Sequence, residues 1–393
     1  MVKYAKRFIP IVIFLLFFPA VLAAQKFVYT NNDLATPGNS VSAFAVDSSG
    51  NLSQVPGSPF STGGLGHGGG LYSSNRIVVI GNFLYASNAG DNTITAFTID
   101  GSTSGLTAVS GSPFPILGFD NPNESGISLA ATPDGKFLYA GTTDGNVTIL
   151  SINTTGALTL AASAPVAADG PIASLKVSPN GSFLVAAIVG LNKEIEVFAI
   201  RSDGSLRTIH KPYLFSSDTA TSVDINCASS LVYVGTAGGN IYALNLNGKN
   251  GHLGPVGGSP FATGLQSNQV AALSADDTML FSSNQGGNTV TAFAVNTDGS
   301  LIVPGTSVSV AGSSGVSNLY PGGLAVSQDG QFLFAADNVG DLIGNAGVTS
   351  FLLNSPSSPL TFGTLASTGI MSQLHSVAAY PAKACTTAVL PSH

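Results

Sequence analysis

Side chains able to take part in acid–base chemistry are scarce in this sequence of 393 residues. It contains five histidines, 13 lysines and arginines, and 20 aspartates and glutamates. Among the histidines, only His375 stands directly ahead of a segment that reads as the first strand of a repeat, residues 376–381. If the fold places this histidine at the mouth of a central channel, its imidazole can act as a general base on water. A histidine in a polar loop can equally well do no more than bond its neighbours, so both interpretations of His375 stay open.

Arg76 and Glu124 stand in similar loops ahead of other expected strands. Arg76 can hold a carboxylate or phosphate through two parallel hydrogen bonds, or it can form a surface salt bridge. Glu124 can orient the histidine or serve as the acid, or it can be a solvated loop carboxylate. We therefore treat His375 and Glu124 as candidate catalytic residues and Arg76 as a candidate substrate-binding residue.

Other polar residues occupy corresponding loop positions. Four of them are predicted to line the same channel mouth and to bind substrate: Gln373, Gln269, Tyr320 and Asp218. The sequence has neither paired histidines at zinc spacing nor a Cys-x-x-Cys pair. Segment 337–341 lacks the spaced carboxylates and final glutamate of a calcium loop, and a plain turn is the better interpretation. We expect no metal and no other cofactor.

These loops belong to a unit that recurs along the chain. Its most regular part is an alternating segment followed by a turn, such as VSAFAVDSSGNL from Val41, ITAFTIDGSTSGL from Ile94 and VTAFAVNTDGSL from Val290. This segment occurs seven times in all, at intervals of roughly 46 to 58 residues. That is the period of propeller blades rather than of helical solenoids. Ahead of each copy after the first lie an apolar strand, a tight turn and a second strand, as in SLAATPDGKFLYAG from Ser128. With the short strand that follows the alternating segment, each unit predicts four antiparallel strands.

The expected strands carry apolar residues on both faces. In ITAFTI, Ile94 and Ala96 point one way, while Phe97 and Ile99 point the other way. Sheets that pack face to face around an axis bury both faces, which favours a propeller over a sandwich. The second strands should start near seven residues: Phe27, Phe83, Phe137, Phe183, Leu231, Met279 and Phe332.

The two ends of the array complement each other. The segment from Lys26 reads as a second strand without a first strand, and residues 376–381 read as a first strand without a second. The C-terminal strand should therefore complete the first blade and remove the exposed edges of an open array. The sequence predicts an all-β, seven-bladed β-propeller over residues 25–385, with four antiparallel strands per blade, and a tail over residues 386–393.

The N-terminus reads as an export signal. Lys3, Lys6 and Arg7 precede an apolar run over residues 8–18, and small residues follow at 20–24. This is the pattern of a signal peptide over residues 1–24, and an uncleaved anchor is the alternative. A second apolar span is absent from the sequence. We expect a protein exported to the periplasm or the extracellular space, with no membrane attachment beyond the leader.

Charge and cysteine content limit the partners. Charged residues make up 8% of the chain and the net charge is −7. The sequence therefore predicts no positively charged surface that would bind nucleic acid. We expect a monomer whose partner is a small-molecule ligand or an unknown protein. Cys227 and Cys385 are both expected on the face opposite the proposed opening, and export permits a disulfide. Whether they pair, or remain one buried and one tail thiol, stays open.

Three motifs together resemble the lactonase family of seven-bladed propellers, of the 6-phosphogluconolactonase and 3-carboxymuconate-cyclase type and similar to YVTN-repeat proteins. They are PDGKFLYA from Pro133, the VSAFAV-type strands, and the GSPF loops at Gly57, Gly111 and Gly258. The resemblance covers nearly all of the chain after the leader. It implies hydrolysis or formation of sugar-acid and muconate lactones, at a site of His, Arg and Glu side chains at one channel mouth.

The family's His-x-His-Ser-Val mark is only partly kept. Residues 373–377 read QLHSV, so His375 matches the second histidine and Gln373 replaces the first. The resemblance implies a lactone hydrolase of carbohydrate metabolism that acts on, or binds, a sugar-acid-like lactone at the channel mouth. The alternative is a non-catalytic binding or scaffold module that keeps the fold after losing the site.

Overall fold

The computed structural model describes residues 26–68, 74–119, 126–189, 194–215, 218–265, 268–310, 319–339, 346–354, 359–369, 374, 376–383 and 385. The expected leader, residues 1–24, and the expected tail, residues 386–393, lie outside this part of the chain. In the part that is described, no helix is long and apolar enough to cross a membrane.

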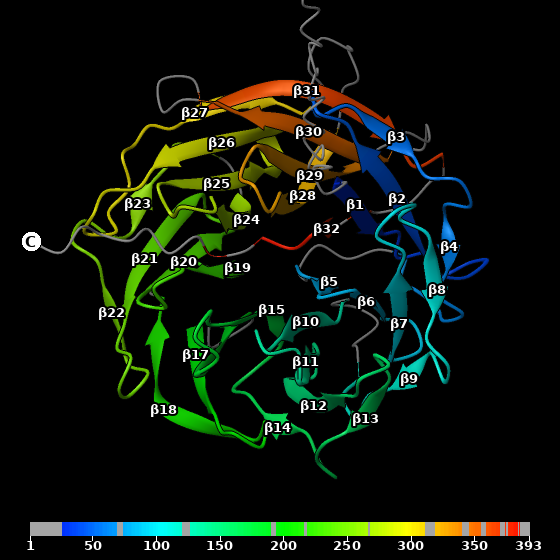
Figure 1. Cartoon of the computed structure of the whole chain (residues 1–393). Helices are drawn as coiled ribbons and strands as arrows, with labels where there is room; N and C mark the ends of the chain where they lie inside the picture. The colour runs from blue at the N-terminus through cyan, green and yellow to red at the C-terminus, as the bar shows by residue number, and fades with distance from the viewer. Residues whose placement is uncertain are drawn as a thin grey trace, which may run out of the picture.

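Seven antiparallel sheets form a ring around a central axis (Figure 1). In six sheets the strands run outward in chain order, and the first is innermost; in the remaining sheet the last strand of the chain, β32 (Val377–Tyr380), lies inside β1 (Lys26–Asn31). The innermost strands are β5 (Ile77–Ile80), β10 (Ser128–Ala131), β15 (Ile172–Val177), β19 (Ala220–Ile225), β24 (Asn268–Leu273), β28 (Leu319–Val326) and β32 (Val377–Tyr380). The second strands are β1 (Lys26–Asn31), β6 (Phe83–Asn88), β11 (Phe137–Gly141), β16 (Phe183–Ile188), β20 (Leu231–Thr236), β25 (Met279–Asn284) and β29 (Phe332–Val339). The seven predicted strand starts are thus met to within one residue.

The outer half of each blade follows the same order. The third strands are β2 (Ser40–Val46), β7 (Thr93–Ile99), β12 (Asn146–Ile152), β17 (Glu194–Ile200), β21 (Asn240–Leu246), β26 (Thr289–Ala294) and β30 (Gly347–Leu353). The outermost are β3 (Leu52–Gln54), β8 (Leu106–Ala108), β13 (Leu158–Leu160), β18 (Leu206–Leu214), β22 (Leu253–Pro255), β27 (Thr306–Ser309) and β31 (Leu360–Ser367). Four blades add a two-residue strand to the third: β4 (Phe60–Ser61), β9 (Phe114–Pro115), β14 (Val166–Ala167) and β23 (Phe261–Ala262). Among the described residues, a 3₁₀ turn at Gln285–Gly287 is the only helical element.

The first blade is closed by the C-terminal strand, as predicted. Strand β32 pairs antiparallel with β1, from Phe27 opposite Tyr380 to Thr30 opposite Val377. The Tyr380 ring stacks on Phe27 with a centroid separation of 6.2 Å. We number this sheet blade 1, and blades 2 to 7 follow in chain order from β5. The prediction of a seven-bladed all-β propeller is confirmed.

The core lies between the blades, because each middle strand is buried on both faces. In β7, Ile94 and Ala96 join a cluster shared with blade 3 that includes Leu129. Phe97 on the opposite face joins a cluster shared with blade 1 that includes Phe27. The predicted division of this strand into two apolar faces is therefore correct, and it follows from the two-residue period of a strand.

Buried tyrosines join successive blades. Each hydroxyl donates a hydrogen bond to a carbonyl in the turn between the third and fourth strands of the next blade. The pairs are Tyr29 to Ser104 (3.3 Å), Tyr85 to Gly156 (3.1 Å), Tyr139 to Gly204 (2.9 Å) and Tyr233 to Gly299 (2.9 Å). These bonds satisfy turn carbonyls that the neighbouring blade covers.

Three of these four turns place a glycine at positive φ: Gly156, Gly204 and Gly299. Gly204 has a φ of +79°, and a Cβ atom added there would lie 2.4 Å from the Phe137 ring of the preceding blade. We expect Gly204→Ala to lower the free energy of unfolding by about 1 to 3 kcal/mol, because backbone strain and the clash act together. Gly248→Ala is the matched control, since Gly248 has no neighbour within 4 Å in a turn between the same strands of blade 5. Equal urea midpoints for the two variants would contradict this account.

Candidate functional site

A cavity of about 450 Å³ occupies the centre of the ring, and residues of all seven innermost strands line it. Asn75 lines the end where these strands begin, which we call the strand-start end. Lys383 and Cys385 line the opposite end, which we call the tail end. Figure 1 shows the segment after β32, in red, running across the middle of the ring toward β19 and β20. Propeller blades surround a central channel, and concave, mostly apolar cavities are where small molecules bind.

Serine hydroxyls connect the innermost strands to one another. Ser128 Oγ accepts the Leu175 amide at 2.9 Å, and Ser222 Oγ accepts the Ala271 amide at 2.9 Å. Ser174 Oγ accepts an amide of the next blade in the same way, at 3.3 Å. These bonds satisfy amides at the inner edges of the sheets. The pairing register places Arg76 and Ser376 at the corresponding positions of blades 2 and 1.

Arg76 forms a buried ion pair at the strand-start end. Its side chain is 1% exposed, and Nη1 lies 2.5 Å from Oδ2 of Asp33, which is equally buried. Asp33 also accepts the His67 amide at 3.1 Å. Arg76 therefore forms a salt bridge, which was one of its two interpretations, but this pair is buried and not on the surface. The sequence did not point to Asp33, because this residue belongs to no motif; it lies three positions before the common pair Thr36-Pro37.

Arg76 and Ser376 are held by consecutive residues of one strand. In β1, Thr30 Oγ1 donates to the Ser376 carbonyl at 2.9 Å, and Asn31 Nδ2 donates to the Arg76 carbonyl at 3.2 Å. The positions directly ahead of β32 and β5 are therefore neighbours across the boundary of blades 1 and 2. His375, Gln373 and Glu124 lie outside the described residues, and their roles stay predictions.

The segment ahead of β5 reaches across the strand-start end. The Ser74 amide donates to the Ala173 carbonyl at 2.9 Å, and Asn75 Nδ2 donates to the Leu175 carbonyl at 3.1 Å. The Asn75 carbonyl accepts the Leu129 amide at 2.8 Å. A loop of blade 2 thus spans the inner edge of blade 3 and contacts blade 4, which narrows the channel at this end.

Asp218 is engaged within its own blade. It is 4% exposed and accepts hydrogen bonds from Thr236 Oγ1 (2.7 Å), the Gly238 amide (2.9 Å) and Asn240 Nδ2 (2.8 Å). Both carboxylate oxygens therefore hold the turn between β20 and β21. Gln269 and Tyr320 lie on innermost strands β24 and β28 as expected, but only their backbones are described. Substrate binding by these three residues stays a prediction.

The tail end carries a cluster of charges. Oδ1 of Asp224 lies 2.7 Å from Lys176 Nζ, and Oδ2 lies 3.7 Å from Lys383 Nζ. Asp224 Oδ2 also accepts the Leu273 amide at 2.8 Å. Burial alone would raise the pKa of Asp224, but the two ammonium groups and this amide outweigh it and lower the pKa to about 2. The signal that could have found this cluster is a charged residue inside an apolar first strand, as in SLKVS and SVDIN.

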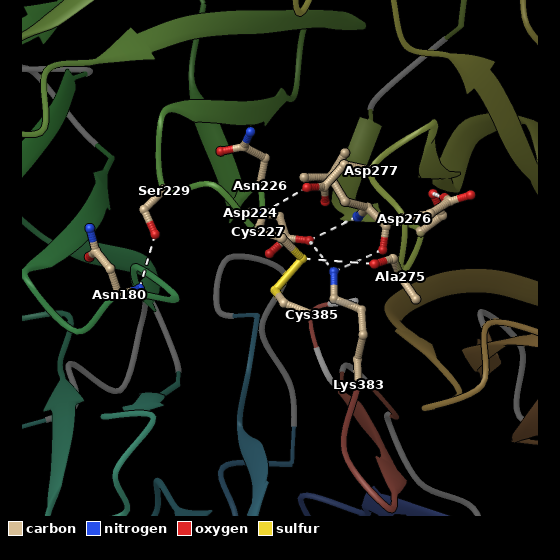
Figure 2. The surroundings of a disulfide bond; sticks show 12 residues. Asn180, Asp224, Asn226, Cys227, Ser229, Ala275, Asp276, Asp277, Lys383 and Cys385 are labelled. Carbon is tan, nitrogen blue, oxygen red and sulfur yellow. Dashed lines mark hydrogen bonds and ion pairs between the residues drawn. A yellow bond between two sulfur atoms is a disulfide. The ribbon is translucent and has the colours of Figure 1, made fainter. Parts of the chain in front are cut away.

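Cys227 and Cys385 form a disulfide beside this cluster, with a Cα–Cα distance of 5.3 Å (Figure 2). The bond attaches the segment after β32 to blade 5, on the face expected from the sequence. Asp277 Oδ2 accepts the Cys227 amide at 2.7 Å, so blade 6 supports the same point. Among the described residues, no group of three or more histidine, cysteine, aspartate or glutamate side chains is placed to hold a metal ion.

Comparison with known proteins agrees with this architecture. Residues 120–216 match the family model described as Lactonase, 7-bladed beta-propeller. Similar solved structures, each 17% identical, include a Lactobacillus plantarum protein with a TM-score of 0.67, covering 90% of this chain and 98% of that one. A putative 6-phosphogluconolactonase from Bacteroides fragilis has a TM-score of 0.70 and covers 92% and 99%. The periplasmic gluconolactonase of Pseudomonas aeruginosa has a TM-score of 0.52 and covers 70% and 78%. No curated protein matches the sequence.

The fold is a seven-bladed propeller, and residues 120–216 of it are similar to the lactonase family of such propellers. The resemblance inferred from the PDGKFLYA, VSAFAV and GSPF motifs is therefore confirmed. At 17% identity, the solved structures show the fold alone. Chemistry must be argued from this chain's own residues.

Proposed function

We propose that this protein hydrolyses, or binds, a small sugar-acid-like lactone at the strand-start end of the channel, as part of carbohydrate metabolism. The observation that carries the proposal is the placement of Ser376 and Arg76 side by side, through Thr30 and Asn31. This arrangement brings the positions ahead of β32 and β5 to one place, as a shared ligand requires. The lactonase-family match over residues 120–216 supports the choice of a lactone.

The chemistry would run through His375 and Glu124. His375 takes a proton from water as its oxygen attacks the lactone carbonyl, which forms a tetrahedral oxyanion. The ring C–O bond then breaks, and the leaving alkoxide takes up the proton from the histidine, which gives an alcohol and a carboxylic acid; the acid then releases its proton to water and becomes a carboxylate. Glu124 orients the histidine or supplies the proton. Arg76 is buried and paired with Asp33, so a contact between its guanidinium and an acidic group of the ligand stays a prediction.

Two observations favour the non-catalytic alternative. Arg76 and Asp218, both predicted to bind substrate, make their described contacts with the protein's own framework. A propeller whose polar residues serve mainly to hold its blades could act as a binding or scaffold module. A hydrolysis assay over a panel of γ- and δ-lactones of sugar acids separates the two functions.

On a lactone that the wild type hydrolyses, His375→Ala is expected to lower kcat by about 10²-fold or more, the scale of a positioned acid–base group. His252→Ala is the matched control, because His252 lies in the turn ahead of the outer strand β22, away from the channel. Full turnover by the His375 variant would remove its catalytic assignment. If the wild type opens no lactone in the panel, the binding-module function takes the place of catalysis.

We also propose that the chain is exported, with residues 1–24 as a signal peptide, to the periplasm or the extracellular space. The disulfide supports this, because such bonds persist in oxidising compartments. One similar structure is described as periplasmic, which concerns that protein. Expression of the full chain in a bacterial host, followed by N-terminal sequencing, should find a start near residue 25. An intact leader in the membrane fraction would instead support the uncleaved anchor.

A further inference from the structure

One ring of side chains in the channel comes from the same position of each innermost strand, as the pairing registers show. In five blades this residue is valine or alanine: Val78, Ala130, Ala272, Ala325 and Ala378. In blades 4 and 5 it is Lys176 and Asp224. All seven residues line the cavity. The charged pair is therefore a local departure from an otherwise apolar ring.

Lys383 adds a second ammonium group to the same carboxylate. Its Nζ donates to the Leu273 carbonyl at 3.0 Å and lies 3.7 Å from Asp224. Asp277 lies on the outer side of this cluster, where it accepts the Cys227 amide, and it is not among the residues that line the cavity. The charged side chains that line the cavity are thus two lysines and one aspartate. On the cavity side, two ammonium groups therefore face one carboxylate, while the charge of Asp277 acts on Lys383 from outside the cavity lining.

From this geometry we propose that the tail end of the channel binds a small carboxylate with an apolar body, whose carboxylate group lies between Lys176 and Lys383. The proposal does not depend on the lactone site, which is at the opposite end. A charge buried in an apolar channel is costly unless an opposite charge offsets it. A bound carboxylate would give the two ammonium groups a second acceptor on the cavity side, where Asp224 is the one carboxylate that lines it.

Both lysines are able to make the contact. An ammonium group has three donors, and in the described part of the chain Lys176 uses one acceptor, Asp224. Its side chain is 38% exposed, into the cavity that it lines. Burial lowers the pKa of Lys383, and the charges of Asp224 and Asp277 oppose this only in part. A bound carboxylate would favour the charged lysine, so affinity should fall as the pH rises through the lowered pKa of Lys383.

The disulfide holds Lys383 in position. Lys383 lies between the paired strand β32 and Cys385, whose bond to Cys227 attaches it to blade 5 (Figure 2). A group held in place before binding loses little conformational entropy when the ligand arrives. Reducing this bond should therefore weaken carboxylate binding, even though neither sulfur contacts the ligand's charge.

The rest of the cavity determines the body of the ligand. Its volume of about 450 Å³ falls in the range of small-molecule pockets. Apart from the charged cluster, most side chains that line it are alanine, valine, isoleucine and leucine. Such walls favour an apolar body over a hydroxylated one. Benzoate is therefore the first probe, and D-gluconate is its hydroxylated counterpart.

Calorimetric titration of the purified protein tests the proposal. Benzoate should bind the wild type, and Lys176→Met and Lys383→Met should each weaken binding by about 10-fold or more, the scale of one charged hydrogen bond. Lys383→Arg, which keeps the charge, should restore most of the affinity. Lys249→Met, at an exposed turn, should leave the affinity unchanged.

Reduction of the wild-type disulfide gives a test that needs no substitution, and it should also weaken benzoate binding. Absence of benzoate binding to the wild type would overturn the proposal. So would equal affinities of the wild type and both methionine variants, or binding of D-gluconate in preference to benzoate. A lactonase assay on the same samples is read separately, since loss of turnover concerns the strand-start end.

Discussion

Deleting residues 376–393 is expected to lower the melting temperature by more than about 10 °C, or to leave the protein aggregated. The deletion removes β32, the innermost strand of blade 1, and exposes the edge of β1 along Phe27–Thr30. Val377, Ala378 and Ala379 are buried, so packing against blades 2 and 7 is lost as well. Thermal unfolding followed by circular dichroism measures the change.

Two controls separate the contributions to this effect. Deleting only residues 386–393 leaves β32 and the disulfide in place, and the melting temperature should stay within about 2 °C of the wild type. The double variant Cys227→Ser with Cys385→Ser removes the crosslink alone, which typically costs about 2 to 5 kcal/mol. The long deletion should be more damaging than the double variant. An unchanged melting curve for the long deletion would rule out closure of the ring by the C-terminal strand.

The second large effect is expected for Arg76→Met, at a cost of about 3 to 5 kcal/mol in the free energy of unfolding. The substitution takes the guanidinium away from Asp33, whose carboxylate is 1% exposed and cannot turn to water without opening the boundary of blades 1 and 2. Urea unfolding measures the loss. Arg201→Met, at an exposed arginine in the turn after β17, should change stability by less than about 0.5 kcal/mol.

A double-mutant cycle makes this prediction specific. Asp33→Leu combined with Arg76→Met removes both charges, so the double variant should be less destabilised than the sum of the two single variants. Additive effects would mean that the ion pair contributes nothing as a pair. The burial of Arg76 also changes how its activity data are read. Loss of lactone binding by an Arg76 variant counts as a ligand contact only if the variant remains folded at the assay temperature.

Local patterns were enough to predict the fold. A two-residue apolar alternation places Ile94 and Phe97 on opposite faces wherever the strand lies. Tight turns need residues that adopt positive φ, and Asp-Gly and Asn-Gly pairs supply them, as Gly204 illustrates. Repetition of these signals sets the number of blades, and the unmatched strand sequences at the two ends predict how the ring closes. Each of these signals is read within a few residues along the chain.

The candidate site was only partly predictable. The sequence analysis identified Arg76 from its place ahead of a first strand, but nothing near it pointed to Asp33. It also predicted that Asp218 binds substrate, which stays a prediction; the structure adds that hydrogen bonds from Thr236, Gly238 and Asn240 engage its carboxylate in a turn. The polar character of a loop residue predicts exposure to a ligand and a structural role equally well. Only the positions of its hydrogen-bond partners distinguish the two.

The charges at the tail end show most clearly what the tertiary structure alone decided. Lys176, Asp224 and Lys383 come from three separate segments, and the curvature of the ring together with the path of the chain after β32 brings them together. The pairing of Cys227 with Cys385 was left open by the sequence for the same reason, since 158 residues separate the two. Strand alternation and turn chemistry act over a few residues. Distances across a closed ring depend on how all seven blades pack, and no local pattern contains them.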